Sequence, residues 1–300
     1  MSDKLIQMQS IMLKNYLNNM KFLKKYDNAL YNRVESLSHD LEKGLIAERY
    51  SLELDENKLN IIDVHNKEKL YEMDPYYDAL YKVSKFYPNI QNAISLITTQ
   101  RIEKRRDPKY EVDSFDFINE YTYLINKYKI MDNKKFKEIG KYIFIGTLLG
   151  IHIDKLHKKI KAKNYLIIEN SLEVFRLSLF FCDYKKISKQ SQTTFIVEQD
   201  DLEYRMILRR FLKNDSKYNH ILKYTVGSNK YTNSLQKLSE IIALENPLLY
   251  SFSDYLGAYG RGIEYIKNGY KILNFQKINS VFENKPILYL GPGPSLSEKY

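Results

Sequence analysis

The sequence predicts an α/β protein built on a Rossmann-like, mainly parallel sheet, with N-terminal helices and a β-hairpin ahead of it. The first observation is the stretch 141–159, in which an apolar, β-branched and aromatic run over 142–145 ends at Gly146 and is followed by Gly150. Apolar residues then recur at helical spacing, so this stretch is a strand, a glycine turn and a helix, the opening of a βαβ unit. The second observation is that the alternation of apolar runs and helical patterns continues to about residue 252, as in a parallel sheet covered on both faces.

The elements before this core follow from period and capping signals. Apolar residues three or four apart predict an amphipathic helix over 4–31, and a second helical piece follows over about 32–45. Alternation of apolar and polar residues on both sides of the set DENK predicts a β-hairpin over about 50–64. Asp74 and Pro75 are typical N-cap and first-turn residues of a further helix. Another helix is expected over about 115–129.

Three more strands are expected within the core, and each has a helical pattern after it. They are 165–169, 194–198 and 221–226, whereas 248–252 is either a fifth strand or a loop. Asp200 and Glu203 have the spacing of a capping box at the start of the helix after the third strand.

The chain divides into four parts. Residues 1–140 form the N-terminal elaboration, 141–252 the Rossmann-like core and 253–285 a helical connector interrupted by glycines. Residues 286–300 contain a fresh apolar strand and a glycine turn. One strand without partners cannot bury itself, so we expect these residues to be the truncated start of a second α/β domain in a longer protein.

Composition and charge narrow the class of protein. The 300 residues are 44% hydrophobic, with no apolar run as long as a membrane span and no signal peptide, so a cytoplasmic protein without a membrane span is expected. Cys182 is the single cysteine, which excludes an internal disulfide. The net charge is +10, but the lysines are interleaved with acids, so a solvated surface is favoured and no nucleic-acid partner is expected. The densest basic cluster is Arg101, Lys104, Arg105 and Arg106.

The glycine turn of the core is one candidate binding site. In open α/β sheets, ligands bind beside the first such turn, and Glu169 at the end of the next strand has the position of an acid that accepts hydrogen bonds from a ribose. The alternative is structural: Gly146 and Gly150 allow tight packing, and Glu169 caps the next helix. His152 and His157 are five residues apart, which is poor spacing for a metal, so surface histidines are expected and no metal site.

The turn GPGPSL near residue 300 is a second candidate. Glycines after a strand let the backbone approach a phosphate, and the helix N-terminus that follows supplies free N–H donors. Ser295 would cap that helix or donate its hydroxyl to the phosphate. The alternative is a turn stiffened by proline.

Several segments together resemble the bacterial motility accessory factors, a family of flagellin glycosyltransferases. The terminal ILYLGPGPSLSE is similar to the start of that family's central domain. The segments RYSLELDENKLNII, LYEMDPYYDA, FIGTLLGIHIDKL and LIIENSLEVFRLSL are similar to its N-terminal domain.

The resemblance implies a cytoplasmic enzyme that transfers a nonulosonic acid, pseudaminic or legionaminic acid, from a CMP-activated sugar to Ser or Thr of flagellin. The partners implied are thus flagellin and a nucleotide sugar, the donor substrate, with no tightly bound cofactor. It also implies that this 300-residue fragment alone is inactive, and it identifies neither catalytic residues nor a metal requirement. The nucleotide-sugar turn implied by the family is Gly291, Gly293, Pro294, Ser295 and Leu296.

Two other functions stay open at this point. The glycine turn and Glu169 are compatible with a methyltransferase that uses S-adenosylmethionine through Gly146, Gly150 and Glu169. Alternatively, the N-terminal domain is a non-catalytic domain that docks flagellin.

Overall fold

The computed structural model describes most of the first 244 residues and one short segment beyond them. Residues 1–252 form one compact unit and 253–300 a second, in which 261–267 form a helix. The basic cluster and the elements expected over 115–129, 248–252 and 286–290 lie outside the described residues. The described ranges are 3–55, 58–89, 91–95, 135–136, 138–215, 218–219, 221–244 and 261–269.

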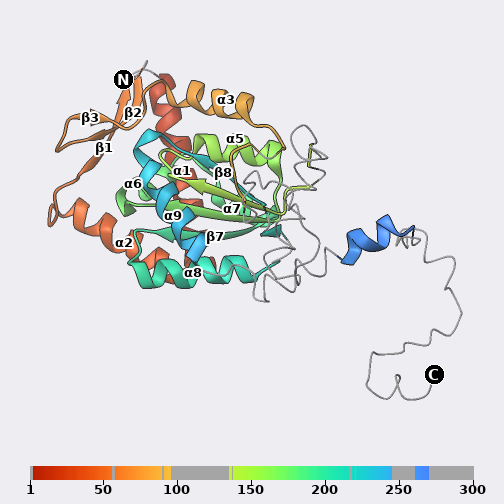
Figure 1. Cartoon of the computed structure of the whole chain (residues 1–300). Coiled ribbons are helices and arrows are strands. Elements are labelled where there is room, and N and C mark those ends of the chain that lie inside the picture. The colour runs from red at the N-terminus through yellow and green to blue at the C-terminus, as the bar shows by residue number, and fades with distance from the viewer. Residues whose placement is uncertain are drawn as a thin grey trace, which may run out of the picture. The chain divides into compact units, whose positions relative to one another are not determined.

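The first unit is a mixed α/β structure with a five-stranded sheet and a small antiparallel sheet (Figure 1). The larger sheet has the order β4-β8-β5-β6-β7, in which the last four strands are parallel and β4 runs antiparallel to β8. The three parallel strands β5, β6 and β8 and most of β7 match the predicted runs, whereas β4 was not predicted. Their bounds are β4 Ala93–Ser95, β5 Lys141–Ile145, β6 Asn164–Glu169, β7 Gln192–Val197 and β8 Ile221–Val226.

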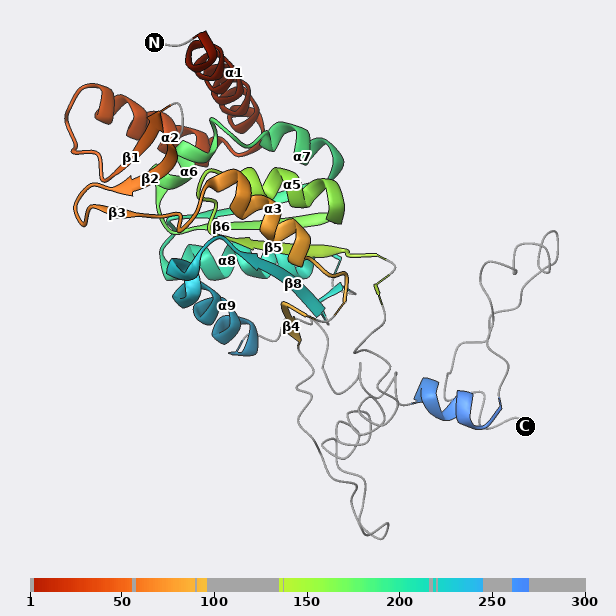
Figure 2. The ribbon, with the colours of Figure 1, turned by 90° about the horizontal axis from the view of Figure 1, so that it is seen from above.

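Helices cover both faces of this sheet, which explains why β5 and β6 are buried at every position. Figure 2 shows α3, α5 and α7 on one face and α8 and α9 on the other. The face toward α5 carries aromatic side chains such as Tyr142, Phe144 and Tyr165, and the face toward α8 and α9 carries aliphatic ones such as Ile143 and Ile145. The bounds are α3 Pro75–Lys85, α5 Ile151–Ile160, α6 Leu172–Ser178, α7 Tyr184–Gln190, α8 Asp201–Lys213, α9 Thr232–Leu244 and a 3₁₀ turn, η2, Asn229–Tyr231.

The predicted caps of α3 and α8 are present. Asp74 accepts hydrogen bonds from the backbone N–H groups of Tyr76 and Tyr77, and Pro75 is the first residue of α3. Asp200 accepts one from the N–H of Glu203 at the start of α8. Both helices therefore begin where the sequence predicts, because these side-chain bonds satisfy N–H groups that have no partner inside the helix.

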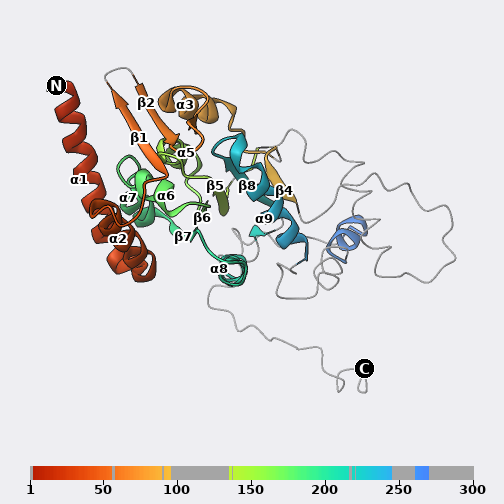
Figure 3. The ribbon, with the colours of Figure 1, turned by 90° about the vertical axis from the view of Figure 1, so that its left-hand side faces the viewer.

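The N-terminal helices differ from the prediction in their boundary. α1 spans Asp3–Tyr26 and α2 spans Asn28–Glu42, so the break comes at Asp27 and not after residue 31. The Asp27 carboxylate accepts a hydrogen bond from the N–H of Leu30 at 3.0 Å and thus caps α2. Figure 3 shows α1 and α2 beside α6 and α7.

The predicted hairpin is confirmed and has a third short strand. β1 (Tyr50–Asp55) pairs antiparallel with β2 (Lys58–Asp63), and β2 pairs with β3 (Glu68–Lys69). No helix among the described residues is long and apolar enough to cross a membrane.

Candidate functional site

The turn after β5 lies at the carboxyl ends of the parallel strands, where open α/β sheets bind their ligands. Its backbone has positive φ at three alternate residues: 87° at Gly146, 47° at Leu148 and 71° at Gly150. Leu148 and Leu149 are fully buried in the core cluster on the α8 and α9 side. The turn is therefore folded into the protein interior, and its leucines leave no bare backbone for a phosphate.

Side chains of the protein fill the space next to the turn. A Cβ added to Gly146 would lie 2.6 Å from the ring of Tyr231, and one added to Gly150 would lie 2.6 Å from the Cβ of Cys182. The N–H of Leu149 donates to the hydroxyl of Tyr71 at 2.9 Å. The positions next to this backbone that a cofactor would need are thus occupied by Tyr231, Cys182 and Tyr71.

Glu169, at the end of β6, is 2% exposed and binds the same turn. One carboxylate oxygen, Oε2, accepts from the backbone N–H of Thr147 at 2.7 Å and from its hydroxyl at 2.8 Å. The other, Oε1, accepts from the N–H groups of Asn170 and Ser171, and the Tyr231 hydroxyl lies 2.9–3.1 Å from both oxygens. Since a carboxylate offers about four acceptor positions, a ribose hydroxyl would have to displace a donor of the protein.

The pKa of Glu169 is raised by burial, and the hydrogen bonds from Thr147, Tyr231 and Ser171 oppose that effect. Tyr231 was not singled out in the sequence, because its contact with Glu169 joins residues 62 positions apart. No local pattern marks such a contact.

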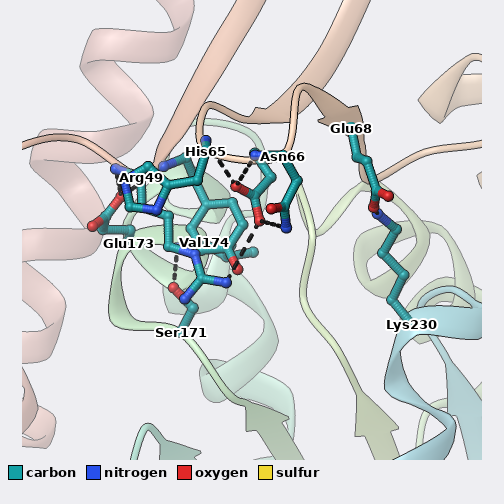
Figure 4. Close-up of polar contacts among 10 residues, drawn as sticks. Arg49, His65, Asn66, Glu68, Ser171, Glu173, Val174 and Lys230 are labelled. Atoms are coloured by element: carbon teal, nitrogen blue, oxygen red, sulfur yellow. Dashed lines mark hydrogen bonds and ion pairs between the residues drawn. The ribbon is translucent and has the colours of Figure 1, made fainter.

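A crevice of about 620 Å³ lies outside this turn, between the small sheet and the ends of β6 and β7. Figure 4 shows charged residues at this crevice and its rim, among them Arg49, Glu68, Glu173 and Lys230, which make polar contacts with the protein. Arg49 lies 3.5 Å from Asp63, and Lys230 of η2 lies 2.6 Å from Glu68 of β3. The carboxylate of Glu173 accepts from the N–H groups of Arg49 and Tyr50 at 2.9 and 2.8 Å. These contacts fasten the small sheet to α6 and η2.

The pKa of Asp63 reflects the contacts that its carboxylate makes with the protein. Burial raises its pKa, but hydrogen bonds from the backbone of Asn66 and His65, together with the Arg49 guanidinium, outweigh burial, so its pKa is lowered. Asp63 therefore serves as an ionised anchor of the loop after β2, and its acceptor positions are turned toward that loop.

A strained residue follows β7 at the rim of the crevice. Glu198 has a φ of 46°, uncommon for a residue with a side chain. Its N–H donates to the carbonyl of Glu169, and its carboxylate accepts from the N–H of Leu172 at the start of α6. Those bonds account for the conformation, which places Glu198 in a capping role.

The described residues contain no group of three side chains suited to a metal ion. The two histidines of α5 are buried, so the prediction of surface histidines was wrong. His152 is 1% exposed and packs against Phe144, and burial lowers its pKa to about 3. His157 lies 3.1 Å from the Tyr165 hydroxyl and 3.0 Å from the Gln190 side chain. Both are core residues, because α5 packs between the sheet and α3.

The candidate turn Gly291, Gly293, Pro294, Ser295 and Leu296 lies outside the described residues. Of the candidates predicted from the sequence, the structure brings together Gly146, Gly150 and Glu169. Thr147 links them, because its N–H and hydroxyl donate to Glu169 and its carbonyl accepts from the N–H of Gly150.

Comparisons with known proteins identify the family. Residues 15–237 match the family model of the glycosyltransferase Maf N-terminal domain. Among solved structures, the chain is similar to a MAf glycosyltransferase from Magnetospirillum magneticum AMB-1, with 12% sequence identity and a TM-score of 0.52. The similarity covers 77% of this chain and 35% of that one. No curated protein sequence matches. The family resemblance is thus confirmed: the chain belongs to the family of the glycosyltransferase Maf N-terminal domain.

Proposed function

We propose that this chain is the N-terminal part of a cytoplasmic glycosyltransferase that transfers a nonulosonic acid from a CMP-activated sugar to Ser or Thr of flagellin. The observation that carries the proposal is the family match over residues 15–237. The proposal concerns a longer enzyme, because the chain spans about a third of the solved relative's length, 35%. The sugar is pseudaminic or legionaminic acid.

Within that enzyme, we assign a structural role to the sheet of the first unit. The order β7-β6-β5-β8 corresponds to strands 3-2-1-4 of a dinucleotide-binding sheet, which supports the proposal that the core is Rossmann-like. Its ligand position, however, is filled by Tyr231, Tyr71 and Glu169. This geometry favours packing roles for Gly146 and Gly150 over a methyltransferase site. It is compatible with a domain that docks flagellin while the sugar is transferred elsewhere.

The donor site is proposed at the turn Gly291, Gly293, Pro294, Ser295 and Leu296. A glycine turn followed by a helix N-terminus provides backbone N–H donors for a phosphate. A CMP-sugar carries one phosphate, which links the cytidine to the sugar, and this phosphate would bind at the turn. Gly293 would allow the close approach, and the Ser295 hydroxyl would donate to the same phosphate.

The test uses the full-length enzyme, with titration of the CMP-sugar and a flagellin modification assay. Gly293→Val should abolish donor binding, because a side chain there intrudes between backbone and phosphate. Ser295→Ala should weaken it by about 1.5–3 kcal/mol, the contribution of a hydrogen bond to a charged group. Thermal unfolding should leave the first unit unchanged in both variants. Donor binding by Gly293→Val equal to that of the parent would place the donor site elsewhere.

A further inference from the structure

The outer edge of β8 is covered by β4 along only half of its length. β4 pairs with residues 221–223 of β8, and the last bond of this ladder runs from the N–H of Tyr224 to the carbonyl of Asn92 at 3.0 Å. Asn92 has a φ of 49°, and the chain leaves the edge there. The remaining residues of β8 extend beyond the end of β4.

The alternation of a strand decides which backbone groups face this uncovered edge. The N–H of Gly227 donates to Ile145 of β5 at 2.7 Å, whereas the N–H of Tyr224 points to the opposite side, toward β4. Because successive residues alternate, the N–H and C=O of Val226 point away from β5, as those of Tyr224 do. Neither group of Val226 has a hydrogen-bond partner within the described ranges.

A groove of about 680 Å³ runs along this part of the edge. Its floor is the segment 224–228 of β8 and the residues after it, and its walls come from α3, the loop before β4 and α9. Figure 2 shows β8 beside the short β4 at one side of the sheet. At the end of the groove, the Ser228 hydroxyl is buried and has no hydrogen-bond partner within the described ranges.

The walls carry exposed aromatic rings and charged residues of both signs, which are Glu72, Asp78, Lys82 and Lys85. Tyr81 of α3 is 54% exposed and Tyr87 is 51% exposed. Lys85 makes no ion pair with another described residue, and its ammonium group lies 5.6 Å from the centre of the Tyr81 ring. Lys82, in contrast, is paired with Asp78. The Glu72 carboxylate accepts a hydrogen bond from the Asn229 side chain. The groove thus combines a free strand edge, aromatic surface and one lysine, Lys85, without an ion pair among the described residues.

At the opposite edge of the sheet, formed by β7, side chains bind the outward backbone groups. The Tyr26 hydroxyl donates to the carbonyl of Thr193 and accepts from its N–H, and Arg33 donates to the carbonyls of Val197 and Glu198. Side chains of α1 and α2 therefore satisfy edge groups of β7, as proteins commonly do to prevent unwanted strand pairing. On the β8 edge, the Tyr142 hydroxyl donates to the Tyr224 carbonyl at 3.2 Å, but no side chain among the described residues reaches the N–H or C=O of Val226.

We propose that the uncovered edge of β8 binds an extended segment of a partner polypeptide, which pairs antiparallel to β8 in line with β4. A strand satisfies the N–H and C=O of Val226 together, which is how added strands gain affinity, and its side chains contact the walls. The unpaired Lys85 favours a segment with an acidic residue beside the pairing position. We take this partner polypeptide to be flagellin. That choice rests on the proposed function, whereas the observation that the edge is open does not depend on it.

Hydrogen exchange of single backbone amides in the 300-residue chain tests the edge itself. The N–H of Val226 should exchange at least about tenfold faster than those of Tyr224 and Gly227, which are hydrogen-bonded. Overlapping 12-residue peptides that span flagellin are then added one by one. A binding peptide should slow exchange at Val226 and leave both neighbours unchanged.

Two pairs of variants separate the edge from the walls. Val226→Pro removes the N–H and should abolish peptide binding, whereas Val226→Ala keeps it and should still bind. Tyr81→Ala tests the walls and stays informative even if Val226→Pro fails to fold. It should weaken binding by roughly fivefold or more. Its control is Tyr77→Ala, on the same helix and 71% exposed but outside the groove, which should bind like the parent.

The inference and the proposed function fail in different ways. A Val226 amide as slow as its neighbours in the chain alone would overturn the inference, as would equal binding by the Tyr81 and Tyr77 variants. Binding by no flagellin peptide, with normal sugar transfer by the full-length enzyme, would also overturn it. Peptide binding without any transfer from a CMP-sugar would overturn the proposed function and leave the strand-binding edge in place.

Discussion

At the scale of single residues, two buried lysines each donate three hydrogen bonds, and these bonds fix nearby loops and the end of a helix. Lys141 of β5 is 1% exposed, and its ammonium group donates to the carbonyls of Phe211 and Leu212 and to the Asn219 side chain. Lys223 of β8 is 2% exposed and donates to the carbonyls of the loop before β4. Lysine is suited to this role, because its three donors meet three acceptors.

Replacing Lys141 should destabilise the first unit strongly. Lys141→Met keeps the length of the side chain but leaves the last carbonyls of α8 without their donor, and each buried unsatisfied acceptor costs about 1–3 kcal/mol. Urea unfolding should show a loss of roughly 2–4 kcal/mol. Lys158→Met is the control, since Lys158 is exposed and its pair with Asp154 contributes at most about 0.5 kcal/mol. An unchanged midpoint for Lys141→Met would contradict this role.

Lys141 should also make stability depend on pH. Burial lowers its pKa from the ordinary lysine value to about 7. From about pH 7 upward, the unfolded chain keeps a proton that the folded chain releases, so the free energy of unfolding rises with pH, by up to about 1.4 kcal/mol per pH unit. Below pH 7 this contribution is constant. Denaturation between pH 6 and 9 should show a smaller slope in Lys141→Met than in the parent; parallel curves would contradict the lowered pKa.

At the scale of elements, one asparagine fixes α1 to the segment between α6 and α7. Asn19 is fully buried, and its amide donates to the carbonyls of Leu179 and Cys182, both at 2.7 Å. Its side-chain oxygen accepts from the N–H of Tyr184 at 3.1 Å. The polar residue is thus fully satisfied within an otherwise apolar interface, which sets the position of α1 along α7.

Asn19→Ala should loosen this attachment. The substitution leaves the Cys182 carbonyl and the Tyr184 N–H unsatisfied at about 1–3 kcal/mol each, less what water regains, whereas the Leu179 carbonyl keeps the Asn15 amide at 3.3 Å, so a loss of about 2–4 kcal/mol is expected. Asn18→Ala is the matched control, since the Asn18 side chain makes no hydrogen bond to another described residue, and should change stability by less than about 0.5 kcal/mol. Limited proteolysis should also cleave α1 faster in the Asn19 variant. Equal stability of the two variants would show that apolar contacts alone position α1.

In the turn after β5, the ring of Tyr231 packs closely against Gly146. Gly146→Ala should destabilise the fold for two reasons, a φ of 87° and a Cβ 2.6 Å from the Tyr231 ring. Tyr231→Ala removes the second reason only. In that background Gly146→Ala should therefore cost less than in the parent, with a coupling of about 0.5–3 kcal/mol in a double-mutant cycle. Strict additivity would show that Tyr231 does not press against the turn.

At the scale of the whole molecule, the occupied ligand position beside the turn after β5 predicts that this chain binds no S-adenosylmethionine. Tyr231 and Glu169 occupy the ligand position of the sheet, so calorimetry of the 300-residue chain should detect no S-adenosylmethionine binding at micromolar concentrations. Glu169→Ala, which empties part of this space at the expense of stability, should not create binding. Micromolar binding by the parent that is lost in Glu169→Ala would instead support a methyltransferase.

The order of elements was largely predictable, because period and caps are local properties of a chain. The apolar runs of β5, β6 and β8 are visible in the sequence itself, and Asp74 and Asp200 mark the starts of α3 and α8 as N-cap residues. β4 was missed, because a three-residue edge strand has too short a pattern to be recognised.

The sequence by itself determined the α/β class, the glycine turn and the family, since each depends on residues that are close along the chain. Only the tertiary structure decided what that turn does. Tyr71 reaches Leu149 across 78 positions, and Tyr231 reaches Glu169 across 62. The burial of His152 and His157 and the uncovered edge at Val226 likewise depend on how distant segments pack. Local patterns specify hydrogen bonds and periods within an element, whereas the side chains that meet between elements are specified by the packing of the whole unit.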